Sequence, residues 1–205
     1  MTGNTQHKIH VTGVICTLII TAFLSWTGYF IFFKTDEIVY SPEKIKQNQR
    51  AAFKHISLVS KAQAEYIKHD HDKNGKLEYS RFITHLWRTI GKDNKRVQLD
   101  LIPKKLAFAI KRRRASDGYY FVQKFKKASS SDGTDVDMDP EKEWGVLMIP
   151  VAEHTGHITF FADQSGNIYA NNTNTRMSIP ENPEFNDSWV LLKDEQELIS
   201  LQQIK

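Results

Sequence analysis

The hydrophobic pattern changes twice along the chain, and each part predicts a different kind of structure. Residues 11–33 (VTGVICTLIITAFLSWTGYFIFF) contain no charged residue. Residues 42–68 then place apolar side chains at helical spacing, and from residue 118 onward short apolar runs alternate with turn residues, as in strands. This order predicts a transmembrane helix followed by an α+β domain.

The uncharged segment 11–33 is long enough to cross a membrane. As a helix it would extend roughly 35 Å, against a hydrocarbon core of about 30 Å. It exceeds the apolar stretch of about 7 to 15 residues that a cleaved signal peptide carries, and the following KTDEIVYSP offers no small-residue cleavage site. We therefore expect an uncleaved single-pass anchor in the cytoplasmic membrane, with a short tail at 1–10 and a linker at 34–41.

Residues 42–68 are expected to form a long amphipathic helix. Ser41 supplies a capping oxygen, Pro42 suits the first helical position, and Glu43 places an acid in the first turn. The apolar stripe that follows consists of Ile45, Ala52, Phe53, Ile56, Val59, Tyr66 and Ile67.

Shorter helices are expected at three places. Residues 79–90 show a second amphipathic pattern, which Gly91 would close as a C-terminal cap. A short helix is predicted over 103–111, and Asp194 to Glu197 resembles a capping-box start for a last one. This last helix belongs to a polar C-terminal extension, 172–205.

Four apolar runs in the second half of the chain predict strands. They are residues 118–125, 144–151, 157–163 and 167–170. A long polar loop follows the first run, and short turns separate the others, which favours an antiparallel meander. The predicted fold is thus an α+β domain over 42–171, in which the long helix packs on a small antiparallel β-meander.

Composition changes this picture little. The net charge of +4 is a mild basic excess, so no nucleic-acid partner is required. The single cysteine, Cys16, lies in the uncharged segment, so the polar part has no thiol for a disulfide or a thiolate metal site. No nucleophile elbow, phosphate loop, dinucleotide fingerprint or Cys-His nucleophile occurs. We therefore expect no enzyme, no small-molecule substrate and no bound cofactor.

Residues 70–81 resemble the calcium-binding loop of an EF-hand. The ligands would come from Asp70, Asp72, Asn74, Lys76 (through its carbonyl) and Glu78. Gly75 stands at the position of the sharp bend, and the helices predicted on both sides complete the pattern. Arg81, however, occupies the position of the closing bidentate glutamate. A calcium site and a plain turn between two helices, rich in Asp, Asn and Gly, both remain open.

Three other groups of residues could in principle bind a ligand or a metal ion, and for each we expect solvated side chains instead. The acidic loop contains Asp132, Asp135, Asp137, Asp139, Glu141 and Glu143. The basic stretch contains Lys104, Lys105, Lys111, Arg112, Arg113, Arg114, Lys124, Lys126 and Lys127. Nucleic acid or anionic lipid could use these cations, but a solvated face or a partner for the acidic loop is favoured. The pairs His69/His71 and His154/His157 are each half of a zinc site.

The order of segments carries a family resemblance. The uncharged N-terminal segment, then RAAFKHISLVSKAQAEY, LIPKKLA, DGYYF and WGVLMIPVAEHTGHITFFADQSGNIYAN resemble type IV pilin-like and pseudopilin-like proteins, across residues 11–171. They are most similar to membrane-anchored extracytoplasmic relatives. The resemblance implies a non-enzymatic domain outside the cytoplasmic membrane, with other membrane or envelope proteins as partners.

The N-terminus departs from the pilin pattern. Pilins carry a glutamate at the fifth mature position, whereas residues 13–20 contain no acid, so an anchor is favoured over a filament subunit. Lys34, Lys44, Lys46 and Arg50 follow the segment and would place the domain in the cytoplasm by the positive-inside rule, against the resemblance. We expect a structural or interaction role for a pilin-like extracytoplasmic domain. The alternative is a membrane-tethered calcium-binding module with the loop 70–81.

Overall fold

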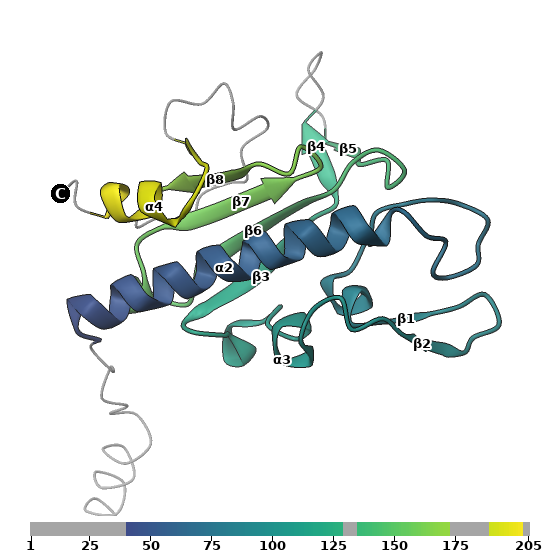
Figure 1. Cartoon of the computed structure of the whole chain (residues 1–205), viewed down its shortest axis with the longest axis horizontal. Coiled ribbons are helices and arrows are strands. Elements are labelled where there is room, and N and C mark those ends of the chain that lie inside the picture. The colour runs from purple at the N-terminus through teal and green to yellow at the C-terminus, as the bar shows by residue number, and fades with distance from the viewer. Residues whose placement is uncertain (1–39, 129–134, 173–188, 203–205) are drawn as a thin grey trace, which may run out of the picture. The chain divides into compact units, whose positions relative to one another are not determined.

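A long helix lies along one face of a five-stranded antiparallel sheet (Figure 1). The computed structural model describes residues 40–128, 135–172 and 189–202, all within one unit that extends from Tyr40 to Lys205. The helix is α2 (Pro42–Tyr66). The strands, in spatial order, are β3 (Tyr119–Lys124), β6 (Gly145–Pro150), β7 (Thr159–Asp163), β8 (Ile168–Asn171) and β9 (Val190–Leu192). The predicted α+β class is confirmed.

Shorter elements surround this framework. Those between α2 and β3 are η1 (Ile83–Leu86), β1 (Arg88–Ile90), β2 (Arg96–Gln98), α3 (Lys104–Ala107) and η2 (Arg112–Arg114), where η denotes a 3-10 helix. The others are β4 (Lys126–Ala128), β5 (Asp135–Asp137), η3 (Glu153–Thr155) and α4 (Glu195–Leu201). Four of them form two antiparallel hairpins, β1 with β2 and β4 with β5.

The start of α2 has the predicted capping chemistry. The Ser41 hydroxyl accepts a hydrogen bond from the backbone N–H of Lys44 at 3.2 Å, Pro42 stands at the first helical position, and Glu43 lies in the first turn. The hydroxyl satisfies a free backbone amide, the proline needs no amide partner, and the acid interacts favourably with the positive end of the helix dipole. The helix ends at Tyr66, two residues before the predicted end, with Ile67 as its C-cap.

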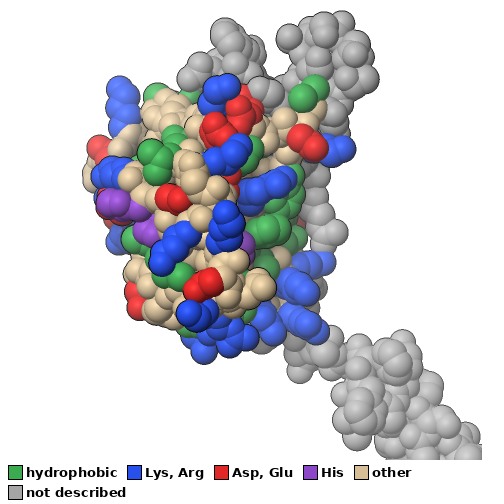
Figure 2. Space-filling model, turned by 90° about the vertical axis from the view of Figure 1, so that its right-hand side faces the viewer, with side chains coloured by type: hydrophobic (Ala, Val, Ile, Leu, Met, Phe, Trp, Pro, Cys, Tyr) green, Lys and Arg blue, Asp and Glu red, His purple; other side chains and the backbone are tan. Residues whose placement is uncertain are grey.

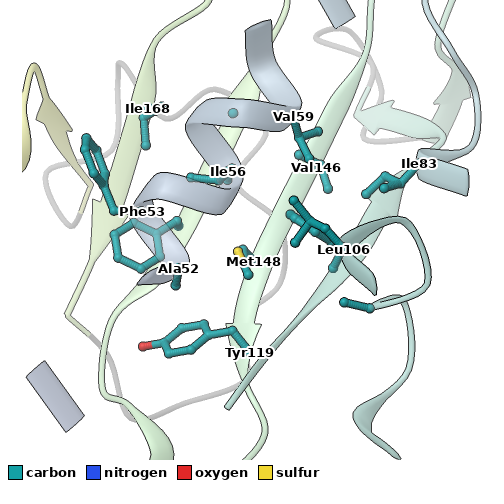
Figure 3. Packing of buried hydrophobic residues seen from close by; sticks show 14 of the residues in the cluster. Ala52, Phe53, Ile56, Val59, Ile83, Leu106, Tyr119, Val146, Met148 and Ile168 are labelled. Carbon is teal, nitrogen blue, oxygen red and sulfur yellow. The ribbon is translucent and has the colours of Figure 1, made fainter. Parts of the chain in front are cut away.

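The main core lies between α2 and the sheet (Figure 3). Ile56 and Val59 of α2 are fully buried in the same cluster as Val146 and Met148 of β6 and Phe160 of β7. Strand residues of the other parity, among them Leu147, Phe161 and Tyr169, form a second cluster with Trp189 on the opposite face. This division follows from the alternation of side chains along a strand.

Buried polar side chains tie α2 to its surroundings. The amide of Gln63 donates to the carbonyl of Ser80 at 2.9 Å, and its oxygen accepts from the N–H of Ser80 at 2.8 Å. Nearer the start of the helix, the side chain of Asn48 donates to the carbonyl of Thr155 at 3.1 Å. All of these groups are buried, so each bond satisfies a polar atom that would otherwise be costly.

The helix predicted over 79–90 is wrong. The chain there forms only the short η1 and then β1, which pairs with β2. Because both backbone groups of Ser80 are bonded to Gln63, they are not free for a helical ladder. Gly91 does not cap a helix; it belongs to the β1–β2 turn, where its N–H donates to the carbonyl of Lys95 at 2.8 Å.

The predicted strands are confirmed, and the structure has further strands that were not predicted. Each of the four predicted runs contains a strand whose ends lie within two residues of the prediction. The hairpin β4–β5 occupies part of the predicted acidic loop, and β9 extends the sheet beyond β8. The helix predicted over 103–111 is shorter, since α3 covers only Lys104–Ala107.

The C-terminal residues belong to the same core as the rest of the domain. α4 begins as its sequence predicts, with the Asp194 carboxylate accepting from the N–H groups of Gln196 and Glu197. Leu192 and Leu198 are buried in the main cluster. In the predicted extension, β9 therefore adds an edge strand to the sheet, and α4 packs on the main core.

None of the helices within 40–128, 135–172 and 189–202 is long and apolar enough to span a membrane. The predicted anchor at 11–33, the tail at 1–10 and most of the linker at 34–41 lie outside these residues, as does the polar segment 173–188.

Gly156 is expected to be essential for the packing of Tyr119. A β-carbon at position 156 would overlap the phenol ring of Tyr119, which is fully buried and donates to the carbonyl of Ile158 at 3.0 Å. Gly156→Ala should therefore lower the free energy of unfolding by about 1–3 kcal/mol or more, measured by denaturant unfolding. Gly145→Ala is the matched control, because its nearest neighbour would lie at 3.4 Å. Equal effects of the two substitutions would contradict this packing argument.

Candidate functional site

The predicted calcium loop forms a tight turn directly after α2, here called the acidic turn (residues 70–78). The carboxylate of Asp70 accepts from the backbone N–H of Asn74 at 3.0 Å and of Gly75 at 2.9 Å. Gly75 has a φ of +90° and Lys73 a φ of +59°, so the chain turns through the left-handed region twice. Desolvation raises the pKa of Asp70, but these hydrogen bonds outweigh it and hold the pKa below its ordinary value.

Asn74 lies among the other carboxylates of the acidic turn. Its side-chain N–H₂ donates to Asp72 at 3.1 Å and to Glu78 at 3.2 Å, while its oxygen accepts from the N–H of Lys76 at 2.8 Å. The structure thus brings the predicted ligands together through hydrogen bonds to an amide. Within the described residues, no three His, Cys, Asp or Glu side chains are arranged to hold a metal ion.

The surroundings of the acidic turn differ from the EF-hand frame. The predicted second helix is absent; instead Tyr79 donates its N–H to the carbonyl of Pro140 at 2.7 Å. Leu77 points into solvent with 55% of its surface exposed, and the ammonium of Lys76 forms an ion pair with Glu141. The turn is therefore attached to the loop before β6 rather than to a second helix.

A small cavity lies between the end of α2 and the β3–β6 edge, beside the acidic turn. Its lining includes Gln63, Ser80, Gln123 and Trp144, and its volume is about 30 Å³. That space holds a few waters, whereas small-molecule sites have volumes of about 300 Å³ or more. The cavity therefore suits hydration of the polar groups around Gln63.

Two acids of the predicted acidic loop, Asp139 and Glu141, form ion pairs with lysines. Lys142 contacts Asp139 at 3.1 Å, and Glu141 pairs with Lys76. In the described part of the chain, the cations at 104–114 form no ion pair with any of these acids. The C-terminal end of the basic stretch does meet the acidic loop, because β4 pairs with β5 and sets Lys126 opposite Asp137. Asp132 lies outside the described residues.

Part of the basic stretch surrounds two aromatic side chains that sequence reasoning placed in predicted helices. The guanidinium of Arg88 lies 4.5 Å from the ring centroid of Trp87, and the ammonium of Lys104 lies 5.2 Å from it. Phe108 meets Trp87 edge to face at 5.6 Å, and Arg114 lies 5.7 Å from the Phe108 centroid. We call these five residues the aromatic–cation cluster. The alternation of Trp and Phe with cations in sequence was its only signal.

The histidines do not assemble into a metal centre among the described residues. His69 and His71 approach each other with ring centroids 5.6 Å apart, and His154 lies 6.1 Å from the ring of Tyr40. Three histidines nevertheless have a lowered pKa. Burial, more than any other cause, lowers the pKa of His55, His71 and His85 below the ordinary value.

Comparison with protein-family models, with curated proteins and with solved structures found no match to this chain. The fold thus defines the protein only as an α+β domain with one long helix on an antiparallel sheet. Any functional assignment depends on the residues described above.

Calcium is expected to leave the acidic turn unchanged. The Asn74 amide already bridges Asp72 and Glu78, and Arg81 stands where a closing glutamate is needed. The melting temperature of the purified chain should therefore not change in millimolar calcium. A rise in melting temperature that Asp72→Asn abolishes, and that an Asp163→Asn control retains, would instead establish the calcium-binding alternative.

Stability is expected to fall between pH 7.5 and 5.5. His55, His71 and His85 have lowered pKa values when folded, so below about pH 6.5 the unfolded chain binds more protons and folding loses stability. His55→Gln should reduce the difference in melting temperature between the two pH values, while His69→Gln, at an exposed histidine, serves as the control. An identical pH dependence in wild type and His55→Gln would contradict the expectation.

Proposed function

We propose that this chain is a non-enzymatic, single-pass membrane protein that presents a pilin-like extracytoplasmic domain to other membrane or envelope proteins. The observation that carries the proposal is the position of α2. It begins at Pro42, shortly after the uncharged segment 11–33, and lies lengthwise on the antiparallel sheet (Figure 1). A chain that leaves a membrane anchor at Phe33 thus enters, nine residues later, the helix that packs against the sheet.

The contacts of α2 support a role in holding the domain at its anchor. The helix is about 38 Å long, and buried side chains join it to the sheet over most of that length. Asn48 near its start bonds to Thr155, and Gln63 near its end bonds to Ser80. A constraint on the start of α2 is therefore transmitted to the whole domain through buried contacts.

Two segments that carry the pilin-like resemblance meet beside the start of α2. Gly118, with a φ of +75°, packs so closely that a β-carbon there would lie 2.9 Å from Thr155 and 3.1 Å from Asn48. Gly156 packs against Tyr119 in the same region. The DGYYF and HTG segments are thus needed together for one packing arrangement.

An exposed aromatic pair supports an interaction role for the domain. Phe82 is 46% exposed and Phe125 is 41% exposed, and their ring centroids lie 5.7 Å apart. Phe82 also meets His85 edge to face at 5.1 Å. Aromatic side chains of this kind are enriched at protein–protein contacts, because they bury a large area with little loss of conformational entropy.

The membrane anchor is tested with charges in the uncharged segment. The full chain should stay in the membrane pellet after alkaline carbonate extraction. The double variant Ile19→Arg/Leu24→Arg should move into the supernatant, because each arginine costs about 2.5–3.5 kcal/mol at the centre of a membrane helix. The matched control, Ile19→Val/Leu24→Ile, should behave like wild type.

Recovery of wild-type protein in the supernatant would contradict the proposed anchor. Orientation is measured separately, by adding protease to right-side-out membrane vesicles. The proposal expects cleavage of the domain from outside, whereas protection until the vesicles are lysed would place the domain in the cytoplasm and contradict its extracytoplasmic position.

A further inference from the structure

We propose that one side of the domain binds the anionic lipid headgroups of the membrane that carries the anchor. This surface, the basic face, consists of Arg88, Lys104, Lys105, Lys111, Arg112, Arg113 and Arg114. The inference rests on the proposed function in one respect only, because it takes residues 11–33 as the anchor. It adds a second attachment to the bilayer, made by the folded domain itself.

The cations of the basic face are open to a ligand. Those at 104–105 and 111–114 are all exposed, and among the described residues none of them forms an ion pair. Figure 2 shows Lys and Arg side chains gathered along the lower side of the domain, where Figure 1 places α3. Asp100 and Asp117, which lie close to these cations in sequence, are bonded to Gln98 and Ser116, and Asp117 also pairs with His55. The exposed cations therefore have no acid of their own to neutralise them among the ion pairs of the described residues.

The aromatic–cation cluster fixes the geometry of the basic face. Arg88 and Lys104 both lie against the ring of Trp87, and Arg114 lies over the ring of Phe108. A guanidinium that stacks on a ring keeps its N–H edge free, and that edge matches a phosphate in a bidentate manner. The cations are therefore partly ordered before a ligand arrives, and Trp is itself a side chain that favours the headgroup region of a bilayer.

One end of the basic face adjoins the point where the chain enters the domain. The guanidinium of Arg112 donates to the carbonyl of Val151, two residues before η3. In η3, the ring of His154 lies 6.1 Å from that of Tyr40, the first described residue.

The covalent connection keeps this end of the domain close to the bilayer. Only residues 34–39 separate the uncharged segment from Tyr40, and the linker can span at most about 25 Å when fully extended. A tethered basic surface meets headgroups at a high effective concentration, so individually weak contacts suffice. Nucleic acid offers the same phosphate chemistry but has no such tether, which is why lipid is the favoured ligand.

The test measures how fast individual lysines react in the full chain. The protein is reconstituted into vesicles of phosphatidylcholine alone, or with about 30 mol % phosphatidylglycerol, a source of anionic headgroups. A membrane-impermeant acetylating reagent is added and each lysine is followed by mass spectrometry. Lys104, Lys105 and Lys111 should react about fivefold more slowly in the anionic vesicles, and about 0.5 M NaCl should remove the difference by screening. Lys61 and Lys92, exposed elsewhere, should not change.

A charge-reversal pair provides the matched variants. Lys111→Glu/Arg113→Glu should abolish the protection of Lys104, because each cation contributes about fivefold to binding at an anionic surface. Lys61→Glu/Lys92→Glu changes the net charge equally and should retain the protection. Equal reaction rates in the two kinds of vesicle, or equal effects of the two pairs, would overturn the proposal.

The remaining outcomes are separate. Protection of the same lysines by a DNA oligonucleotide in neutral vesicles, with none from phosphatidylglycerol, would identify a nucleic-acid surface and overturn the lipid proposal. If the anchor itself is wrong, the chain will fail to float with neutral vesicles, whatever the lysines report. Failure of the proposed function is thus distinguishable from failure of the basic face.

Discussion

Burial of α2 against the antiparallel sheet is the interaction on which the rest of this structure depends. A helix of this length gains little from intrinsic propensity, and its stability comes from packing of one apolar stripe. Ile56 and Val59 supply that stripe, and the inward side chains of β6 and β7 receive it. Because α4, η1 and α3 also place buried leucines in the same cluster, loss of the helix would expose the whole core.

The positions at which sequence reasoning succeeded are those where a local pattern and the core agree. The cap at Ser41, the helical stripe of α2 and the period-two strands each satisfy their own backbone groups, so a single sequence reveals them. Residues 79–90 show where this breaks down. Their apolar spacing is helical, but Gln63, which is 17 residues away, takes both backbone groups of Ser80. Such a tertiary bond leaves no periodic signal.

In the candidate sites too, contacts between residues close in sequence could be predicted, whereas contacts between distant residues could not. The acidic turn was recognisable because its Asp, Asn and Gly residues act on each other within nine positions, yet its second helix was not, since that depended on residues far away. The aromatic–cation cluster was missed for a related reason. Trp87 and Phe108 meet across 21 positions, through the β1–β2 hairpin and α3, and their sequence context gave each a separate role in a predicted helix. Spacing alone cannot bring such residues together.

The two charged regions differ in how they are balanced, and this difference bears on what each can bind. Carboxylates of the acidic turn and of the loop before β6 already have partners in Asn74, Lys76 and Lys142, so a ligand would have to displace existing bonds. The basic face lacks that internal compensation: its rings order the cations but do not neutralise them, and anionic headgroups would add a charge partner without breaking an ion pair. The proposal assigns the headgroups to the basic face. Phe82 and Phe125, near the far end of the helix, then form a separate surface for a protein partner.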